Sequence, residues 1–155
     1  MDLSPSLSAK WGPVDLDELL GLVVDGAARQ IGAERGTLFL LDRARDELVS
    51  RAANLPEVRE IRLPTSEGIA GWVGRKGESV EVRDAADDPR FSPRIDELTG
   101  FRTRSLLAVP LRGRDDAVVG VLQAVDSRTG AFERGALARF EELAGQVSAV
   151  LAGTS

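Results

Sequence analysis

The 155-residue chain contains no cysteine and no histidine. Their absence excludes disulfides, thiolate nucleophiles, Cys/His zinc sites and every Ser-His or Cys-His catalytic arrangement. Lysine is almost as scarce, because Lys10 and Lys76 are the only two, and neither lies in an apolar sequence context that suits a catalytic base. The sequence therefore predicts no catalytic residue and no metal site, and we expect a protein that is not an enzyme.

Long apolar runs and a basic excess are also missing. No run approaches the roughly 18 residues that a membrane span needs. Lys and Arg total 20 against 25 for Asp and Glu, which gives a net charge of −5. Nucleic-acid binding needs a basic face, so we expect no direct nucleic-acid partner and no membrane span. The first residues lack the pattern of a secretory leader, and we expect a cytoplasmic location.

The chain has the length of one ordinary domain. Residues 1–13 mix Ser, Pro and Gly without a period and predict a flexible arm, which leaves residues 14–152 for the domain. Apolar residues recur at helical spacing over 15–31 and again after Phe132, and both stretches predict long amphipathic helices.

The segments between these helices are short and are punctuated by Gly, Pro and Asp. Six of them have strand patterns, at 36–42, 47–53, 60–63, 79–82, 104–112 and 117–126. Short helices are expected at 68–76 and 93–98, with a long polar connection at 83–93 between 79–82 and the second short helix. We therefore expect an α+β fold with a central antiparallel sheet of about six strands. The terminal helices would pack on one face and the short helices and loops on the other.

Four segments in this order resemble the GAF domain family: Glu67–Val73 (EGIAGWV), Asp88–Phe91 (DPRF), Ser105–Leu111 (SLLAVPL) and Val119–Gln123 (VGVLQ). The resemblance extends from about residue 15 to residue 152. It implies a small-molecule sensing and dimerisation domain of a signalling protein, with an output signalling domain on the same or a partner chain.

The resemblance does not name a cofactor. Cyclic-nucleotide-binding members carry an Asn-Lys pair, then Phe, then Asp-Glu, and the equivalent residues here are Asp126, Ser127, Phe132, Ala136 and Leu137. Only the Phe is kept, so the cyclic-nucleotide motif is degraded. Bilin-binding and methionine-sulfoxide-reducing relatives need Cys, and haem-binding relatives commonly use His. Haem, covalent bilin and zinc are therefore disfavoured, and the cofactor is unknown.

Several residues are candidates for a ligand pocket. Trp72 and Phe91 suit stacking on a planar ligand, although aromatic side chains also plug the space between a loop and a sheet. Arg104 and Ser105 begin an apolar strand and suit an anionic group, or else lie at the surface and at the top of the sheet. The Gln123 amide, in an apolar strand, needs a backbone neighbour or a ligand as its partner. The candidate pocket comprises Phe39, Trp72, Asp84, Phe91, Arg104, Ser105 and Gln123.

The terminal helices are candidates for homodimer contacts, because apolar and small residues widen their main stripe. Packing against the sheet explains the same residues. The candidates are Leu16, Leu20, Val23, Ala27, Leu137, Ala144, Val147 and Leu151. Two functions follow. The first is a regulatory, non-catalytic sensor of a small molecule in a signalling or transcription-regulating protein, which relays its ligand state through the terminal helices. The second is a ligand-free dimerisation or protein-interaction module.

Overall fold

The structure is a computed structural model that describes residues 16–53, 60–128, 130 and 132–153. The arm expected over residues 1–13 lies outside the described residues. The elements in chain order are α2 (Leu16–Gln30), β1 (Arg35–Asp42), β2 (Glu47–Ala53), β3 (Arg62–Pro64), α3 (Gly68–Lys76), β4 (Val80–Val82), the 3₁₀ turn η1 (Ala85–Asp87), α4 (Arg94–Thr99), β5 (Ser105–Arg112), β6 (Val118–Asp126) and α5 (Ala136–Gly153).

The six strands form one antiparallel sheet in the order β3-β2-β1-β6-β5-β4. The first and last strands of the described chain segments therefore meet in the centre, where β1 pairs with β6. The expected edge strand at 60–63 is found as β3 at the sheet edge. Pro64 is tolerated there because an edge strand has no neighbour on its outer side that needs a backbone N–H donor. The predicted α+β class and strand number are confirmed.

The turns of two tight hairpins each contain an aspartate with left-handed backbone conformation. Asp46 (φ 55°) closes the turn between β1 and β2, and Asp116 (φ 63°) closes the turn between β5 and β6. Aspartate tolerates this conformation better than most residues with a side chain. Both turns connect strands that the sequence predicted, 36–42 with 47–53 and 104–112 with 117–126.

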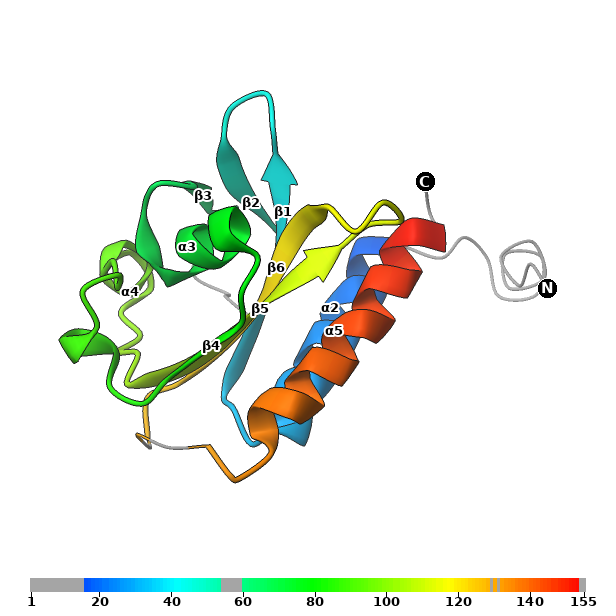
Figure 1. Ribbon diagram of the computed structural model, residues 1–155. Coiled ribbons are helices and arrows are strands. Elements are labelled where there is room, and N and C mark those ends of the chain that lie inside the picture. The colour runs from blue at the N-terminus through cyan, green and yellow to red at the C-terminus, as the bar shows by residue number, and fades with distance from the viewer. Residues whose placement is uncertain (1–15, 54–59, 129, 131, 154–155) are drawn as a thin grey trace.

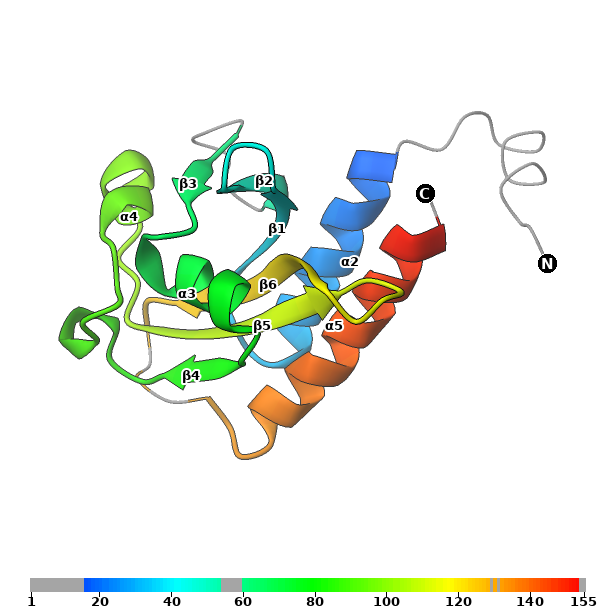
Figure 2. The ribbon, with the colours of Figure 1, turned by 45° about the horizontal axis from the view of Figure 1, so that its top comes forward.

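The helices α2 and α5 lie side by side on one face of the sheet (Figures 1 and 2). Strand residues alternate between the two faces, so Leu107 and Val109 of β5 pack under these helices while Leu106 and Ala108 point to the other face. Leu20, Phe140 and Val147 are fully enclosed in the helix-side layer. This confirms the expected placement of both terminal helices on one face.

The opposite face carries α3, α4 and the connection around η1 (Figure 1). Gly77 (φ 69°) and Gly100 (φ 75°) end α3 and α4 in the left-handed conformation that glycine adopts without strain. Ile69 and Val73 of α3 are buried against Phe39 and Val121 of the sheet. Among the described residues, no helix is both long and apolar enough to cross a membrane.

Candidate functional site

A small cavity lies between the sheet and the covering segments α3 and α4. Its volume is about 50 Å³, which is room for a few water molecules. The lining residues come from β1, β3, β5, β6, both short helices and the segment before β5: Arg35, Thr37, Leu63, Glu67, Gly68, Ile69, Ala70, Phe91, Ser92, Arg94, Ile95, Asp96, Thr99, Phe101, Thr103, Leu106, Gln123 and Val125. The cavity is therefore on the face away from α2 and α5.

The floor of the cavity contains two opposed polar side chains. Thr37 of β1 and Gln123 of β6 are directly paired in the antiparallel register and point to the same face. Their exposed fractions are 5% and 9%. Neither side chain forms a hydrogen bond with any residue in the described part of the chain. Leu106 and Val125, which pair with each other on β5 and β6, supply the apolar floor next to them on the Arg35 side.

The segments that cover the cavity, α3, α4 and the residues next to them, form its roof. Glu67, the residue before α3, connects the two helices. The Ser92 hydroxyl donates a 2.7 Å hydrogen bond to Glu67 Oε1, and Arg94 Nη1 lies 3.5 Å from Glu67 Oε2. The ion pair is largely solvent-exposed and adds little stability, whereas the hydroxyl bond is partly buried. Together they fix the start of α4 against the start of α3.

Asp96, in the first turn of α4, connects this helix to the segment before β5. Both carboxylate oxygens accept hydrogen bonds from Thr103, one from its backbone N–H and one from its hydroxyl, each at 2.8 Å. Thr103 lies just before β5, so Asp96 joins α4 to the sheet. The first turn of α4 is therefore held by two carboxylates, Glu67 and Asp96, each of which has its own donors.

Arg35 lies at the edge of the floor and stacks on the roof. Its guanidinium carbon is 4.4 Å from the centre of the Phe101 ring. A guanidinium over an aromatic face is attracted by the ring quadrupole. This contact makes Phe101 a third link between the roof and the sheet.

The structure brings two of the seven predicted pocket residues to the cavity, Phe91 and Gln123. Phe39 is fully buried under α3 in the core, which is the alternative that the sequence left open. Ser105 is fully buried, and Arg104 is exposed and pairs through its backbone with Asp126 and Ala85. These three residues do not line the cavity, because burial and strand position direct them elsewhere.

Trp72 and Asp84 also lie outside the cavity. Asp84 is exposed and precedes η1. Trp72 is partly buried against the core on this face of the sheet, and the guanidinium carbon of Arg90 lies 4.6 Å from its ring centre. Arg90 in turn bonds both oxygens of Asp88, at 3.0 and 2.7 Å, and this hydrogen-bonded guanidinium holds the pKa of Asp88 below its usual value. Trp72 therefore belongs to an outer stack on the covering loop.

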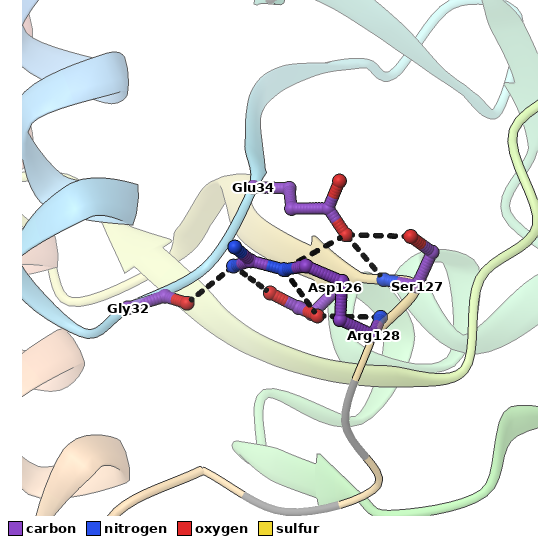
Figure 3. A network of polar contacts seen from close by, with 5 residues as sticks. All are labelled: Gly32, Glu34, Asp126, Ser127 and Arg128. Atoms are coloured by element: carbon purple, nitrogen blue, oxygen red, sulfur yellow. Dashed lines mark hydrogen bonds and ion pairs between the residues drawn. The ribbon is translucent and has the colours of Figure 1, made fainter.

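A polar network joins the ends of β1 and β6 (Figure 3). The fully buried Asp126 carboxylate accepts the Arg128 backbone N–H at 2.8 Å and its Nη2 at 2.8 Å, which raises the pKa of Arg128. Glu34 Oε1 accepts both the backbone N–H and the hydroxyl of Ser127, at 2.8 and 2.6 Å. Arg128 Nη2 also donates to the Gly32 carbonyl at 3.2 Å.

This network occupies the positions of the degraded Asn-Lys pair. Asp126 and Ser127 are joined to the β1 side, whereas Phe132 and Leu137 pack, partly buried, against the helix-side core. Ala136 is buried at the start of α5. The residues that replace the cyclic-nucleotide motif thus form their own connection between the sheet and α5.

The predicted dimer residues are divided by their burial. Leu20, Ala27, Ala144 and Val147 are enclosed in the core of the chain itself, so they pack against the sheet and present no outer surface. Val23, Leu137 and Leu151 are partly buried at the margin of that core, and the side chain of Leu16 lies outside the described part. The exposed apolar residues of α2 are Leu19 (40%) and Leu22 (67%), which were not among the candidates.

The sequence interpretation missed most of the cavity lining. Arg35 and Thr37 share a face with Phe39 through the two-residue period of β1, and Thr37 is a polar residue in an otherwise apolar run, which was an available signal. Asp96, Phe101 and Thr103 come together only through the fold of the covering segment. Among the described residues, no group of three or more His, Cys, Asp or Glu side chains is arranged to hold a metal ion.

Comparison with known proteins identifies the family of the domain. The model of the family described as "GAF domain" matches residues 15–151. The chain is 35% identical over 124 residues to dual 3',5'-cyclic-AMP and -GMP phosphodiesterase 11A of Takifugu rubripes, with 73% of this chain and 14% of that protein covered. It thus spans about one seventh of the length of that relative.

Solved structures give the same result. The GAF domain of the Acinetobacter phosphoenolpyruvate-protein phosphotransferase is 28% identical, with a TM-score of 0.76 over 90% of this chain and 84% of that chain. The free methionine-R-sulfoxide reductase of Neisseria meningitidis, solved in complex with its substrate, is 24% identical, with a TM-score of 0.74 over 96% of this chain and 83% of that chain. The second similarity shows a shared fold only.

Proposed function

Because the chain belongs to the GAF domain family, whose members are regulatory sensor domains of signalling proteins, we propose that it senses a small molecule in its covered cavity. The domain acts without catalysis, in the cytoplasm, and relays its ligand state through α2 and α5 to an output domain on the same or a partner chain. The carrying observation is the cavity itself, which has a polar floor, an apolar surround and a roof held mainly by polar side chains.

The cavity fits a binding role better than a packing role. A core that only stabilises the fold is filled by apolar side chains, and buried polar groups in it are hydrogen-bonded. Here Thr37 and Gln123 face an open volume instead. The cavity is smaller than a metabolite, so we infer that a ligand displaces α4 outward as it enters and that α4 closes over it.

The route to the helices runs through two adjacent pairs of residues. Arg35 and Val125 line the cavity, and their chain neighbours Glu34 and Asp126 belong to the polar network of Figure 3. That network reaches the Gly32 carbonyl just after α2 and Arg128 on the way to α5. A shift of the β1 and β6 ends is therefore passed to both helices at once.

Thiol chemistry is outside this proposal. The Neisseria meningitidis relative is named as a reductase, but this chain has no Cys to supply electrons. Binding without turnover is consistent with the side chains that line the cavity.

The test is a thermal-shift panel of nucleotides, amino acids, organic acids and neutral heterocycles on the purified domain. Ala70→Leu fills the cavity from α3, and Ala138→Leu adds the same atoms on the exposed side of α5 as a matched control. We expect at least one compound to stabilise the wild-type protein and Ala138→Leu but not Ala70→Leu. Equal stabilisation of all three proteins, or none by any compound, contradicts the proposal.

The second candidate is a ligand-free homodimerisation module, and Leu22 favours it. A leucine with 67% of its surface exposed on a terminal helix, next to the 40% exposed Leu19, suits a contact with a second copy. A dimer contact through these leucines would leave the cavity open, because the exposed leucines and the cavity lie on opposite sides of the sheet.

A further inference from the structure

The floor of the cavity contains two polar side chains whose hydrogen-bonding groups are available to a molecule in the cavity. Thr37 and Gln123 are each more than nine-tenths buried, lie opposite each other on β1 and β6, and form no hydrogen bond within the described residues. Buried polar groups are nearly always paired with protein or ordered water. These two side chains therefore select the chemistry of whatever fills the cavity.

Gln123 selects for an amide-like edge. Its side chain presents a carbonyl acceptor and an N–H donor on the same edge, and this edge is complemented by a neighbouring N–H and carbonyl on a ligand. Thr37 adds a hydroxyl that accepts or donates. A carboxylate satisfies the donors but places its charge against the Gln123 carbonyl oxygen, so an amide edge is the better match.

The charges around the cavity favour a neutral ligand. The lining contains two arginines and two carboxylates, which cancel formally. Glu67 is engaged by Ser92 and Arg94, and Asp96 by Thr103. Arg35 stacks on Phe101. Each charged group thus has a contact within the protein, and a charged ligand must compete with one of them.

The remaining lining favours a flat apolar body. Phe91, Ile95 and Phe101 lie over the floor from the covering segment, and Leu106 and Val125 lie in the floor beside Gln123. Aromatic and aliphatic walls pack well on a planar ring. The volume of about 50 Å³ limits the body to a single ring once α4 has adjusted.

We propose that the ligand is a neutral, planar, single-ring molecule with a lactam or primary carboxamide edge, which is read by Gln123 and Thr37 on the cavity floor. This inference rests on the proposed sensing function and specifies its ligand class. The edge hydrogen-bonds to the floor, the ring packs under Phe91 and Ile95, and α4 closes over it.

The experiment uses 2-pyridone as the probe, with N-methyl-2-pyridone as the comparison compound in which a methyl group replaces the N–H hydrogen. Binding is followed by ¹H–¹⁵N NMR, in which the Gln123 side-chain NH₂ signals report directly on the edge. The variants are Gln123→Met and Thr37→Val, which keep the size of each side chain and remove its hydrogen bonds. Two variants at separate sites, each checked by its backbone spectrum, guard against loss of folding in one of them.

We expect 2-pyridone to shift the Gln123 NH₂ signals and to bind at least tenfold more tightly than its N-methyl form. Either variant should weaken 2-pyridone at least tenfold and should weaken N-methyl-2-pyridone, which keeps only the carbonyl acceptor of this edge, by a smaller factor. Equal binding of the two compounds, or unchanged binding in both variants, overturns the inference. Absence of 2-pyridone binding also overturns it and leaves the two floor side chains to water.

These failures are distinguishable from failure of the sensing function. If 2-pyridone does not bind but a charged compound of the panel stabilises the protein and is blocked by Ala70→Leu, the ligand class is wrong and sensing stands. If no compound of either experiment binds, sensing fails as well.

Discussion

Gly71 in α3 is the position at which one added methyl group should do most damage near the site. A Cβ at this position would lie 2.7 Å from the Thr65 carbonyl oxygen and 3.2 Å from the Pro64 carbonyl oxygen. Real Cβ atoms do not approach backbone oxygens so closely. Thr65 O also accepts a hydrogen bond from Arg75 Nη1, so Gly71→Ala disturbs an atom that already has a partner.

The expected change in the free energy of unfolding is the sum of three effects, two destabilising and one stabilising. Overpacking against backbone that cannot move freely destabilises by about 1–3 kcal/mol. Weakening the Arg75 bond to Thr65 destabilises by a further 0.5–1.5 kcal/mol or so. Replacing a helical glycine by alanine stabilises by about 1 kcal/mol. The net expectation for Gly71→Ala is a loss of about 1–3 kcal/mol, or a fall in Tm of roughly 2–12 °C for a domain of this size.

Gly74, one turn further along α3, is the matched control. A Cβ there would meet Leu48 and Val121 methyl groups at 3.7 Å, which is ordinary van der Waals contact. Gly74→Ala should therefore keep the helix-propensity gain and raise stability by up to about 1 kcal/mol. Both variants are measured by urea unfolding followed by far-ultraviolet circular dichroism.

The result that refutes the reasoning is equality of the two variants. If Gly71→Ala is as stable as Gly74→Ala, α3 does not depend on close approach to the turn before it. A loss in Gly74→Ala as large as that in Gly71→Ala would mean that α3 packs more tightly on β2 and β6 than its side-chain distances indicate.

Three further outcomes are expected. Asp126→Asn replaces a buried acceptor of charged hydrogen bonds and should lower the free energy of unfolding by about 1.5–3 kcal/mol in urea, whereas a loss below about 0.5 kcal/mol contradicts the network as a structural link. The ionised Asp88 carboxylate contributes to the free energy of unfolding. This contribution is fully present above the ordinary pKa of 3.8 and is lost as the pH falls through the lower folded-state pKa. In a Trp11→Phe background, the midpoint of the Trp72 fluorescence change with pH should therefore lie below 3.8, and a midpoint at or above that value would refute it. Leu22→Glu should convert a dimer to a monomer in sedimentation without lowering Tm, and a monomeric wild-type protein removes the dimer proposal.

The fold was predictable because its signals are local. The period of the apolar residues in α2 and α5, and the glycines that end α3 and α4, each act within a few residues. Strand faces follow from alternation, as in Leu106 and Leu107 of β5, which point to opposite layers. The boundaries that shifted, such as α4 beginning at Arg94, lie at helix ends where one residue is the normal uncertainty.

The site was less predictable because its residues are brought together by tertiary contacts. Asp96 looked like an ordinary residue of a short helix until its carboxylate was seen to bond Thr103 across the covering segment. Arg104 had the expected chemistry, but its strand position leaves the side chain outside the cavity. Gln123 was identified because polarity in an apolar strand is itself a local signal, and the equivalent signal at Thr37 was passed over.

The two faces of the sheet differ in how firmly they are held, and this difference suits a sensor. None of the residues of α4 is fully buried, and it is held by the partly buried Ile95, which packs against the core, and by a few hydrogen bonds, each worth about 0.5–1.5 kcal/mol net. The helices α2 and α5 instead enclose large apolar side chains such as Leu20 and Phe140. We therefore expect local opening to begin at α4 and to leave the helix-side core intact. In the proposed function, a ligand that closes α4 acts on this less firmly held face of the domain, and α2 and α5 carry the resulting shift of β1 and β6 as one body.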